Sequence, residues 1–290
     1  MYIVKNCRDC PRDCNKQRSL STGAGFCKMG MKPKIARVSL HHWEEPCISG
    51  ENGSGTIFFS GCNMHCIYCQ NYNISTMNKG TLISINKLAD IYKELEEMGV
   101  HNINLVTPTH FSYTILKSFE MYKPKIPIIY NSSGYEKVDT LKHFEGVVDV
   151  YLVDIKYYDR LKSKKYSNID NYFEIASSAI KEMFRQTGEV VFDSNGIINK
   201  GIIIRHLILP ISTKDSIKIL EWIKCTFNKS ILVSLMSQYT PLNDLSNFQE
   251  INRKITKREY EKVLNKFIEL ELNGYVQELS SANKCYIPDF

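Results

Sequence analysis

No stretch of this 290-residue chain approaches the roughly 18 consecutive apolar residues that span a bilayer, so we expect no membrane helix. The N-terminal segment MYIVKNCRDC lacks the apolar core of a secretory signal, which favours a cytoplasmic protein. Basic residues outnumber acidic ones only 37 to 31 and are spread along the chain, so a nucleic-acid partner is not indicated. The sequence also lacks internal repeats and low-complexity segments. With 43% hydrophobic and 23% charged residues, the composition is that of a globular protein.

Cysteine is the residue type in which the chain is unusual. It has ten cysteines, and most of them lie in its first quarter. A reducing cytoplasm keeps thiols out of disulfides, so clustered cysteines indicate metal ligands. Outside the clusters, Cys47 is a candidate reactive thiol, Cys225 fits packing on a helix, and Cys285 near the chain end has no interpretation. The clusters form two groups: Cys7, Cys10, Cys14 and Cys27, then Cys62, Cys66 and Cys69.

From Thr56 onward, short apolar stretches alternate with amphipathic ones. The apolar stretches are nearly continuous, which is typical of strands buried on both faces of a parallel sheet. Thr256 and Glu259 form a capping box that starts the last helix, and we expect Gly274 to end it. The predicted strands are 56–60, 103–107, 126–131, 147–154, 202–209 and 231–236, and the other predicted helices are 88–98, 113–122, 172–186 and 214–227.

Six such units predict an α/β fold, a partial (βα)6 TIM-like barrel. A doubly wound open sheet is the alternative. Both folds place reactive groups at the carboxyl ends of the strands. Residues 51–290 would form the barrel. Residues 1–50, which are poor in apolar periodicity, would form a Cys-rich extension that folds on binding metal.

The strongest signal is a CxxxCxxC motif, Cys62-x3-Cys66-x2-Cys69, directly after the first predicted strand. Three closely spaced thiolates bind three irons of a [4Fe–4S] cube and leave the fourth iron open. The alternative is a closed zinc or ferredoxin-like site, completed by His65 or a distant cysteine. A non-catalytic electron carrier would need such a fourth ligand, which the loop itself does not supply.

The segment SGCNMHCIYCQN, with Tyr68 before the third cysteine, resembles the hallmark of the radical S-adenosylmethionine (SAM) superfamily. Nearly the whole chain is similar to uncharacterised relatives of pyruvate formate-lyase-activating enzyme, through HHWEEPCISGENGSG, NLVTPTH, PIIYNSSGY, VVDVYLVDIKYYD, IIIRHLILP and SLMSQYTP. The resemblance implies that Cys62, Cys66 and Cys69 hold the cluster and that SAM chelates the open iron. One-electron reduction would then give methionine and a 5′-deoxyadenosyl radical that abstracts a hydrogen atom.

The resemblance also implies SAM-binding positions on the second and third strands. Tyr68 accompanies the cluster. Thr107 and Thr109 stand where the superfamily has a Gly-Gly-Glu motif that orients the methionyl amine, and the absence of that motif here is a departure. Thr109 and strand-end carbonyls would take over this role. Asn131 and Ser132 end the third strand, where the family contacts the ribose or carboxylate.

Two further pairs of polar residues lie on the fourth and fifth strands. Asp154 and Lys156 resemble the Asp-x-Lys of the activating enzymes, with Lys156 on the SAM carboxylate and Asp154 facing the substrate as the catalytic candidate. The alternative is an ordinary surface ion pair. Arg205 and His206 interrupt an apolar strand, so each needs a partner. A polar ligand in the barrel would satisfy one of them, and a buried structural network is the alternative.

The N-terminal group, Cys7-x2-Cys10-x3-Cys14-x12-Cys27, has enough thiols to close a metal site. A structural zinc and an auxiliary [4Fe–4S] cluster both fit an all-thiolate set. The remaining alternative is that some of these thiols bind no metal. The polar and aromatic segment 41–47 lies just before the first barrel strand. It lines the substrate site in one interpretation and is a packed linker in the other.

We therefore expect a cytoplasmic oxidoreductase of the radical SAM type that works anaerobically. Its substrate is a partner protein in which it makes a glycyl radical, or a small molecule or peptide that it modifies. Flavodoxin or ferredoxin would donate the electron.

Overall fold

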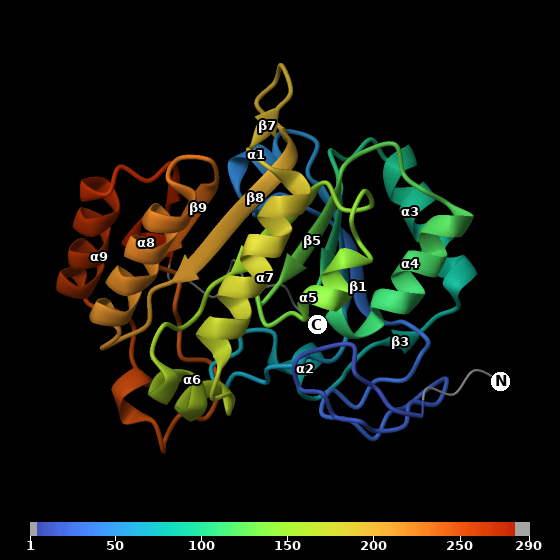
Figure 1. Cartoon of the computed structure of the whole chain (residues 1–290), viewed down its shortest axis with the longest axis horizontal. Coiled ribbons are helices and arrows are strands. Elements are labelled where there is room, and N and C mark those ends of the chain that lie inside the picture. The colour runs from blue at the N-terminus through green and yellow to red at the C-terminus, as the bar shows by residue number, and fades with distance from the viewer. Residues whose placement is uncertain (1–4, 282–290) are drawn as a thin grey trace.

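The computed structural model describes residues 5–281, and its centre is one ten-stranded sheet (Figure 1). Seven strands are parallel to one another, and β1 pairs antiparallel with β2 at one side. β3 adds to β1, and β7 forms a short antiparallel pair with β8. The strands are β1 (Lys34–His41), β2 (Ser54–Phe59), β3 (Thr81–Leu82), β4 (Ile103–Val106), β5 (Ile128–Ser132), β6 (Val150–Asp154), β7 (Val191–Phe192), β8 (Ile198–Leu207), β9 (Leu232–Met236) and β10 (Gly274–Val276).

The predicted fold class is confirmed. All six predicted strands are present, as β2, β4, β5, β6, β8 and β9. The sheet order β2-β4-β5-β6-β8-β9-β10 follows the chain without a reversal, so the doubly wound alternative, whose order reverses at a switch point, does not fit. The barrel is partial, because within residues 5–281 no pairing joins β10 to β3.

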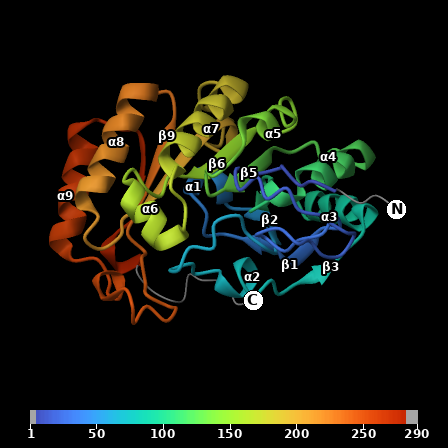
Figure 2. The ribbon, with the colours of Figure 1, turned by 60° about the horizontal axis from the view of Figure 1, so that its bottom comes forward.

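Helices cover the outer face of the sheet, with α3 and α4 beside β4 at one end and α8 and α9 at the other (Figure 2). The core lies between these helices and the strands, where side chains such as Ile57, Leu105 and Ile204 are fully buried. The helices are α1 (Pro46–Ser49), α2 (Tyr72–Ser75), α3 (Ile85–Glu97), α4 (Ser112–Met121), α5 (Val138–Lys142), α6 (Arg160–Ser167), α7 (Tyr172–Thr187), α8 (Thr213–Phe227) and α9 (Lys257–Glu269), with 3-10 turns η1 (Thr109–Phe111), η2 (Gln249–Ile251) and η3 (Leu279–Ser281).

The last helix begins as predicted and ends earlier. Both bonds of the Thr256–Glu259 capping box form at the start of α9. The helix ends at Glu269, and Gly274, which we expected at its end, instead opens β10. Its φ of +142° and the close approach of Val233 leave no room for a side chain, so the strand pairing requires glycine here.

The N-terminal segment before β1 has little regular structure. Its described part consists of loops with two isolated bridges, Arg18 to Gly23 and Thr22 to Met29. β1 and α1 lie within the predicted extension, and both pack onto the barrel, where Cys47 and Ile48 are buried. The division of the chain at residue 50 stays a prediction. No helix in the part of the chain that the structure describes is long and apolar enough to cross a bilayer.

Candidate functional site

A cavity of about 600 Å³ opens at the carboxyl ends of the parallel strands. Parallel strands end at one edge of the sheet, so residues far apart in the sequence meet there. Most of the predicted site residues line it: Cys62, Cys66, Tyr68, Cys69, Thr107, Asn131, Ser132, Asp154, Lys156 and Arg205. The lining of this one cavity thus brings together three thiols, two cations and a carboxylate.

The CxxxCxxC loop follows β2, and each of its three sulfur atoms accepts a hydrogen bond. The backbone N–H of Met64 donates to Cys62 Sγ at 3.3 Å. The hydroxyls of Ser167 and Ser75 donate to Cys66 Sγ at 3.0 Å and to Cys69 Sγ at 3.3 Å. Donors aimed at sulfur stabilise thiolates and tune the potentials of iron–sulfur clusters. The donor set therefore fits a cluster bound through three thiolates.

Burial makes these thiols poor acids unless a metal binds them. It raises the pKa of Cys62 to about 12 and also raises that of Cys69. A buried thiol of this kind is neutral at pH 7, whereas coordination to a metal deprotonates a thiol outright. The loop is thus suited to a metal rather than to a free thiolate nucleophile.

Tyr68 connects the loop to the barrel wall through a chain of hydroxyls. Its hydroxyl lies 2.7 Å from that of Tyr157, which lies 2.8 Å from Ser167 Oγ, and Ser167 donates to Cys66. All these side chains are buried. The aromatic residue of the motif therefore fixes the hydroxyl network behind the middle cysteine.

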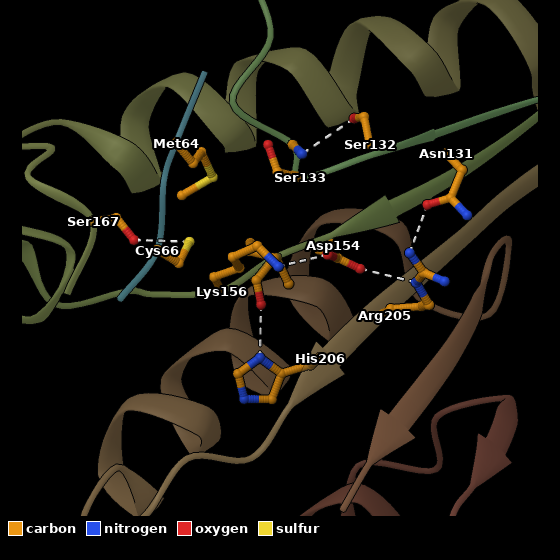
Figure 3. A network of polar contacts seen from close by, with 12 residues as sticks. Met64, Cys66, Asn131, Ser132, Ser133, Asp154, Lys156, Ser167, Arg205 and His206 are labelled. Carbon is orange, nitrogen blue, oxygen red and sulfur yellow. Dashed lines mark hydrogen bonds and ion pairs between the residues drawn. The ribbon is translucent and has the colours of Figure 1, made fainter. Parts of the chain in front are cut away.

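Asp154, Lys156 and Arg205 form an ionic network in the lining of the same cavity, with Lys156 close to Cys66 (Figure 3). Asp154 accepts from Lys156 Nζ at 2.6 Å and from Arg205 Nε at 2.9 Å. Arg205 also donates to Asn131 Oδ1 at 2.6 Å and pairs with Glu44 at 3.2 Å. Asp154 and Lys156 are only 22% and 20% exposed, so they are not the ordinary surface pair of the alternative interpretation.

The charges of this network hold one another in the ionised state. Burial alone would raise the pKa of Asp154, but Lys156 and Arg205 outweigh it and the pKa is lowered. Burial would likewise lower the pKa of Lys156, and Asp154 and the Cys66 sulfur outweigh it and raise the pKa. Two cations therefore remain charged beside the cysteine loop, where an anionic group of a ligand can pair with them.

Thr107, Thr109 and His206 lie in three different environments. Thr107 lines the cavity with φ +59°, an unfavourable conformation for a β-branched residue, of the kind that clusters at functional sites. Thr109 is buried away from the cavity and donates to Glu136 at 2.6 Å. His206 points to the helix side of β8, where it bonds Ile155 O and Ser216 Oγ at 2.7 and 2.8 Å (Figure 3). Successive strand residues face opposite sides, so Arg205 faces the cavity and His206 does not.

The segment before β2 supplies wall residues whose roles were not assigned from sequence. Trp43, Glu44 and Glu45 line the cavity. Glu44 accepts from Asn104 as well as Arg205. Glu45 Oε2 is buried without a hydrogen-bond partner among the described residues, so a donor group of a ligand can pair with it. The sequence signal for these three residues was a run of polar residues just before a barrel strand. That run gave no indication of their hydrogen-bond partners.

The other cysteines separate into distinct environments. Cys7, Cys10, Cys14 and Cys27 all line one second, smaller cavity. Cys47 is 2% exposed and burial raises its pKa to about 11, so the prediction of a reactive thiol was wrong. Cys225 is exposed on α8 rather than packed. Cys285 lies outside the described residues. Within residues 5–281, no three His, Cys, Asp or Glu side chains converge as the ligands of a single ion would.

The partial parallel barrel carries a CxxxCxxC loop and an ionic network where its strands end, the edge at which barrel enzymes have their active sites. The chain belongs to the radical SAM superfamily, whose family model matches residues 56–223, more than half of its length. It is 31% identical over 271 residues to an uncharacterized protein of Methanocaldococcus jannaschii. The alignment covers 90% of this chain and 74% of the relative.

Two solved structures resemble the chain at low sequence identity. Methylornithine synthase superimposes with a TM-score of 0.50 at 15% identity, covering 80% of this chain and 73% of that chain. SuiB of Streptococcus suis bound to SAM superimposes with a TM-score of 0.49 at 15% identity, covering 77% of this chain and 50% of that chain. The chain thus spans about half the length of SuiB.

Proposed function

We propose that this protein is an enzyme that cleaves SAM reductively to abstract a hydrogen atom from a substrate. Cys62, Cys66 and Cys69 would hold a [4Fe–4S] cluster at the floor of the large cavity. When bound, the cluster supplies one electron to SAM, whose C5′–S bond breaks to give methionine and a 5′-deoxyadenosyl radical. The observation that carries the proposal is that three hydrogen-bonded thiols, and no fourth one within residues 5–281, face a cavity of about 600 Å³.

The ionic network would hold SAM. Lys156 would donate to its carboxylate, because its ammonium lines the cavity beside the cysteine loop. Asn131, Ser132 and the Thr107 turn would contact the rest of the molecule from the ends of β5 and β4. Asp154 would keep Lys156 and Arg205 in place and face the substrate with its carboxylate.

The substrate would approach along the wall of the segment before β2. Glu45, with an unpaired buried oxygen, would accept a hydrogen bond from a polar group of the substrate. This suits an N–H- or O–H-bearing small molecule, peptide or protein segment. A low-potential one-electron donor of the flavodoxin or ferredoxin class would supply the electron.

The experiment is anaerobic reconstitution with iron and sulfide, followed by incubation with SAM and dithionite. We expect stoichiometric 5′-deoxyadenosine and methionine from the natural protein, measured by liquid chromatography. The triple substitution Cys62→Ala, Cys66→Ala, Cys69→Ala should abolish both products. Cys225→Ala is the matched control, because that thiol is exposed on α8 and outside the cavity lining. Product formation by the triple variant would overturn the proposal.

A further inference from the structure

Backbone hydrogen bonds close the loops that carry the four N-terminal cysteines. Cys7 N–H donates to Lys16 O and Asn15 N–H donates to Cys7 O, both at 2.9 Å, which brings the two ends of the first loop together. A second turn follows, in which Lys28 N–H donates to Gly25 O at 3.0 Å. The result is that four sulfur-bearing side chains from positions 7 to 27 line the same small cavity.

Hydrogen-bond donors face two of these sulfurs. Phe26 N–H donates to Cys14 Sγ at 3.3 Å, and Arg18 Nη1 donates to Cys7 Sγ at 3.8 Å. The three sulfurs of the CxxxCxxC loop likewise accept from backbone and hydroxyl donors. This pattern is the one by which a protein stabilises cluster-bound thiolates.

Two arginines supply positive charge at the wall of this cavity. Arg18 is only 3% exposed, and its Nη1 lies 3.8 Å from Cys7 Sγ and 2.8 Å from Asp9. Arg12 lies on another part of the wall. Burying a guanidinium is costly unless an anion or acceptors compensate for its lost solvation. Four thiolates carry more negative charge than one zinc ion neutralises, and a cube bound by four thiolates likewise has a net negative charge, so buried cations fit either form.

The cavity adjoins the back of the CxxxCxxC loop. Arg12 donates to Asn63 O at 2.7 Å, to Met64 O at 3.3 Å and to Ser167 O at 3.1 Å. The ring of Phe26 lies 4.5 Å from that of His65, and Arg12 stacks over Phe26 at 3.9 Å. Residues between and beside the N-terminal cysteines therefore contact every residue between Cys62 and Cys66.

We infer that Cys7, Cys10, Cys14 and Cys27 hold a second iron–sulfur cluster, a [4Fe–4S] cube closed by four thiolates and docked through Arg12 on the loop of the first. A cube is favoured over zinc because the donors on these sulfurs, Arg18 Nη1 on Cys7 and Phe26 N–H on Cys14, resemble those on the sulfurs of the CxxxCxxC loop. With no open iron, this cube can exchange electrons but cannot chelate SAM.

The first test is the metal content of the natural protein after anaerobic reconstitution. Two cubes predict about eight irons and eight sulfides per chain. Four irons with about one zinc, or four irons with no second metal, would each overturn the inference. This measurement needs no variant, so it holds even if substitutions impair folding.

The second test assigns the cube. The triple Cys62→Ala, Cys66→Ala, Cys69→Ala variant should retain about four irons and a reduced-state electron paramagnetic resonance spectrum that added SAM leaves unchanged. The Cys10→Ser, Cys27→Ser variant should retain about four irons with a spectrum that SAM does change. A folded triple variant without iron, judged by circular dichroism, would overturn the inference. If the natural protein holds eight irons but forms no 5′-deoxyadenosine, the proposed function fails and the second cube stands.

Discussion

The two cysteine sites of this protein are in contact through Arg12, yet they differ in the structure that supports them and in the space beside them. The CxxxCxxC loop follows a buried barrel strand and opens on a cavity of about 600 Å³. The N-terminal site is made of loops and faces a small cavity whose wall carries two arginines. The first site has three thiols and room for a ligand, and the second has four thiols and little room. In the proposed function, the count of cysteines and the space beside them would together separate a cluster that binds a ligand from a closed one.

The sources of order also differ. The CxxxCxxC loop directly follows β2, whose six residues are all buried and fix where the loop begins. The N-terminal loops contain no such run, and their packing depends on polar contacts such as those of Arg12 and Arg18. We therefore expect metal removal to loosen the N-terminal segment more than the barrel.

The largest contrast should come from single cysteines, one from each site. Cys66→Ala should abolish SAM cleavage, because a cube with two protein ligands is lost or misplaced. Cys27→Ala should lose a similar amount of iron and keep measurable 5′-deoxyadenosine formation with dithionite, since the first cluster's ligands are intact. Iron analysis and product chromatography on the two variants check this. Equal activity loss in both would break the proposed division between a reactive and a closed site.

Lys156→Met should come next in effect and touches the open site only. A charge-assisted hydrogen bond contributes on the order of 1.5–3 kcal/mol, so SAM binding should weaken roughly ten- to a hundredfold. Iron content should not change, because no cluster ligand is altered. Titration of SAM into the reduced protein, followed by paramagnetic resonance, measures the affinity. Lys164→Met, at an exposed lysine of α6, is the control, and an unaltered affinity in Lys156→Met would remove this residue from the SAM site.

Arg12→Met should weaken the contact between the two sites. Its guanidinium donates to carbonyls of Asn63, Met64 and Ser167, and losing these bonds should cost roughly 2–3 kcal/mol. The melting temperature of the reconstituted protein should fall by several degrees, and a chelator should remove iron faster. Arg160→Met, at a guanidinium 73% exposed in a surface pair, should change neither measurement. A stable Arg12 variant would show that the sites are held together by other contacts.

Ser167→Ala should have the smallest effect, a change in potential alone. The serine hydroxyl donates to Cys66 Sγ at 3.0 Å, which favours the more negative, reduced cluster. Removing a bond worth about 0.5–1.5 kcal/mol should lower the one-electron potential of the first cluster by roughly 20–60 mV. A redox titration measures it, with the exposed Ser178→Ala as control. A change in the second cluster's potential instead would mean that the two spectra had been assigned to the wrong sites.

Much of the barrel was predictable because its strands are continuous apolar runs. β6, with the sequence VYLVD, is an example, and the capping box of α9 was equally readable. β10 was not predicted, because a three-residue strand that begins with glycine has too short a pattern. β1 alternates partly buried and exposed residues, and its polar positions concealed it beside the cysteine-rich segment.

The cysteine ligand sets could be proposed from spacing alone, but the ionic network could not be. Asp154 faces Arg205 because the two are paired in the register of β6 and β8, and that register is set by tertiary packing. Glu44 meets Arg205 across 161 positions of sequence. His206 was grouped with Arg205 in the sequence, and only the strand's alternation of faces separates them.

The contacts of Arg12 also impose an order on the making of this protein. The four N-terminal cysteines are synthesised well before Ser167, whose carbonyl oxygen accepts a hydrogen bond from Arg12 across 155 positions of sequence. This contact therefore cannot form until the chain has been synthesised as far as the end of α6. During that interval their thiols are exposed to oxidants and to competing metals. Metal loading or protection of these cysteines would then have to begin before the docking contacts of Arg12 are complete.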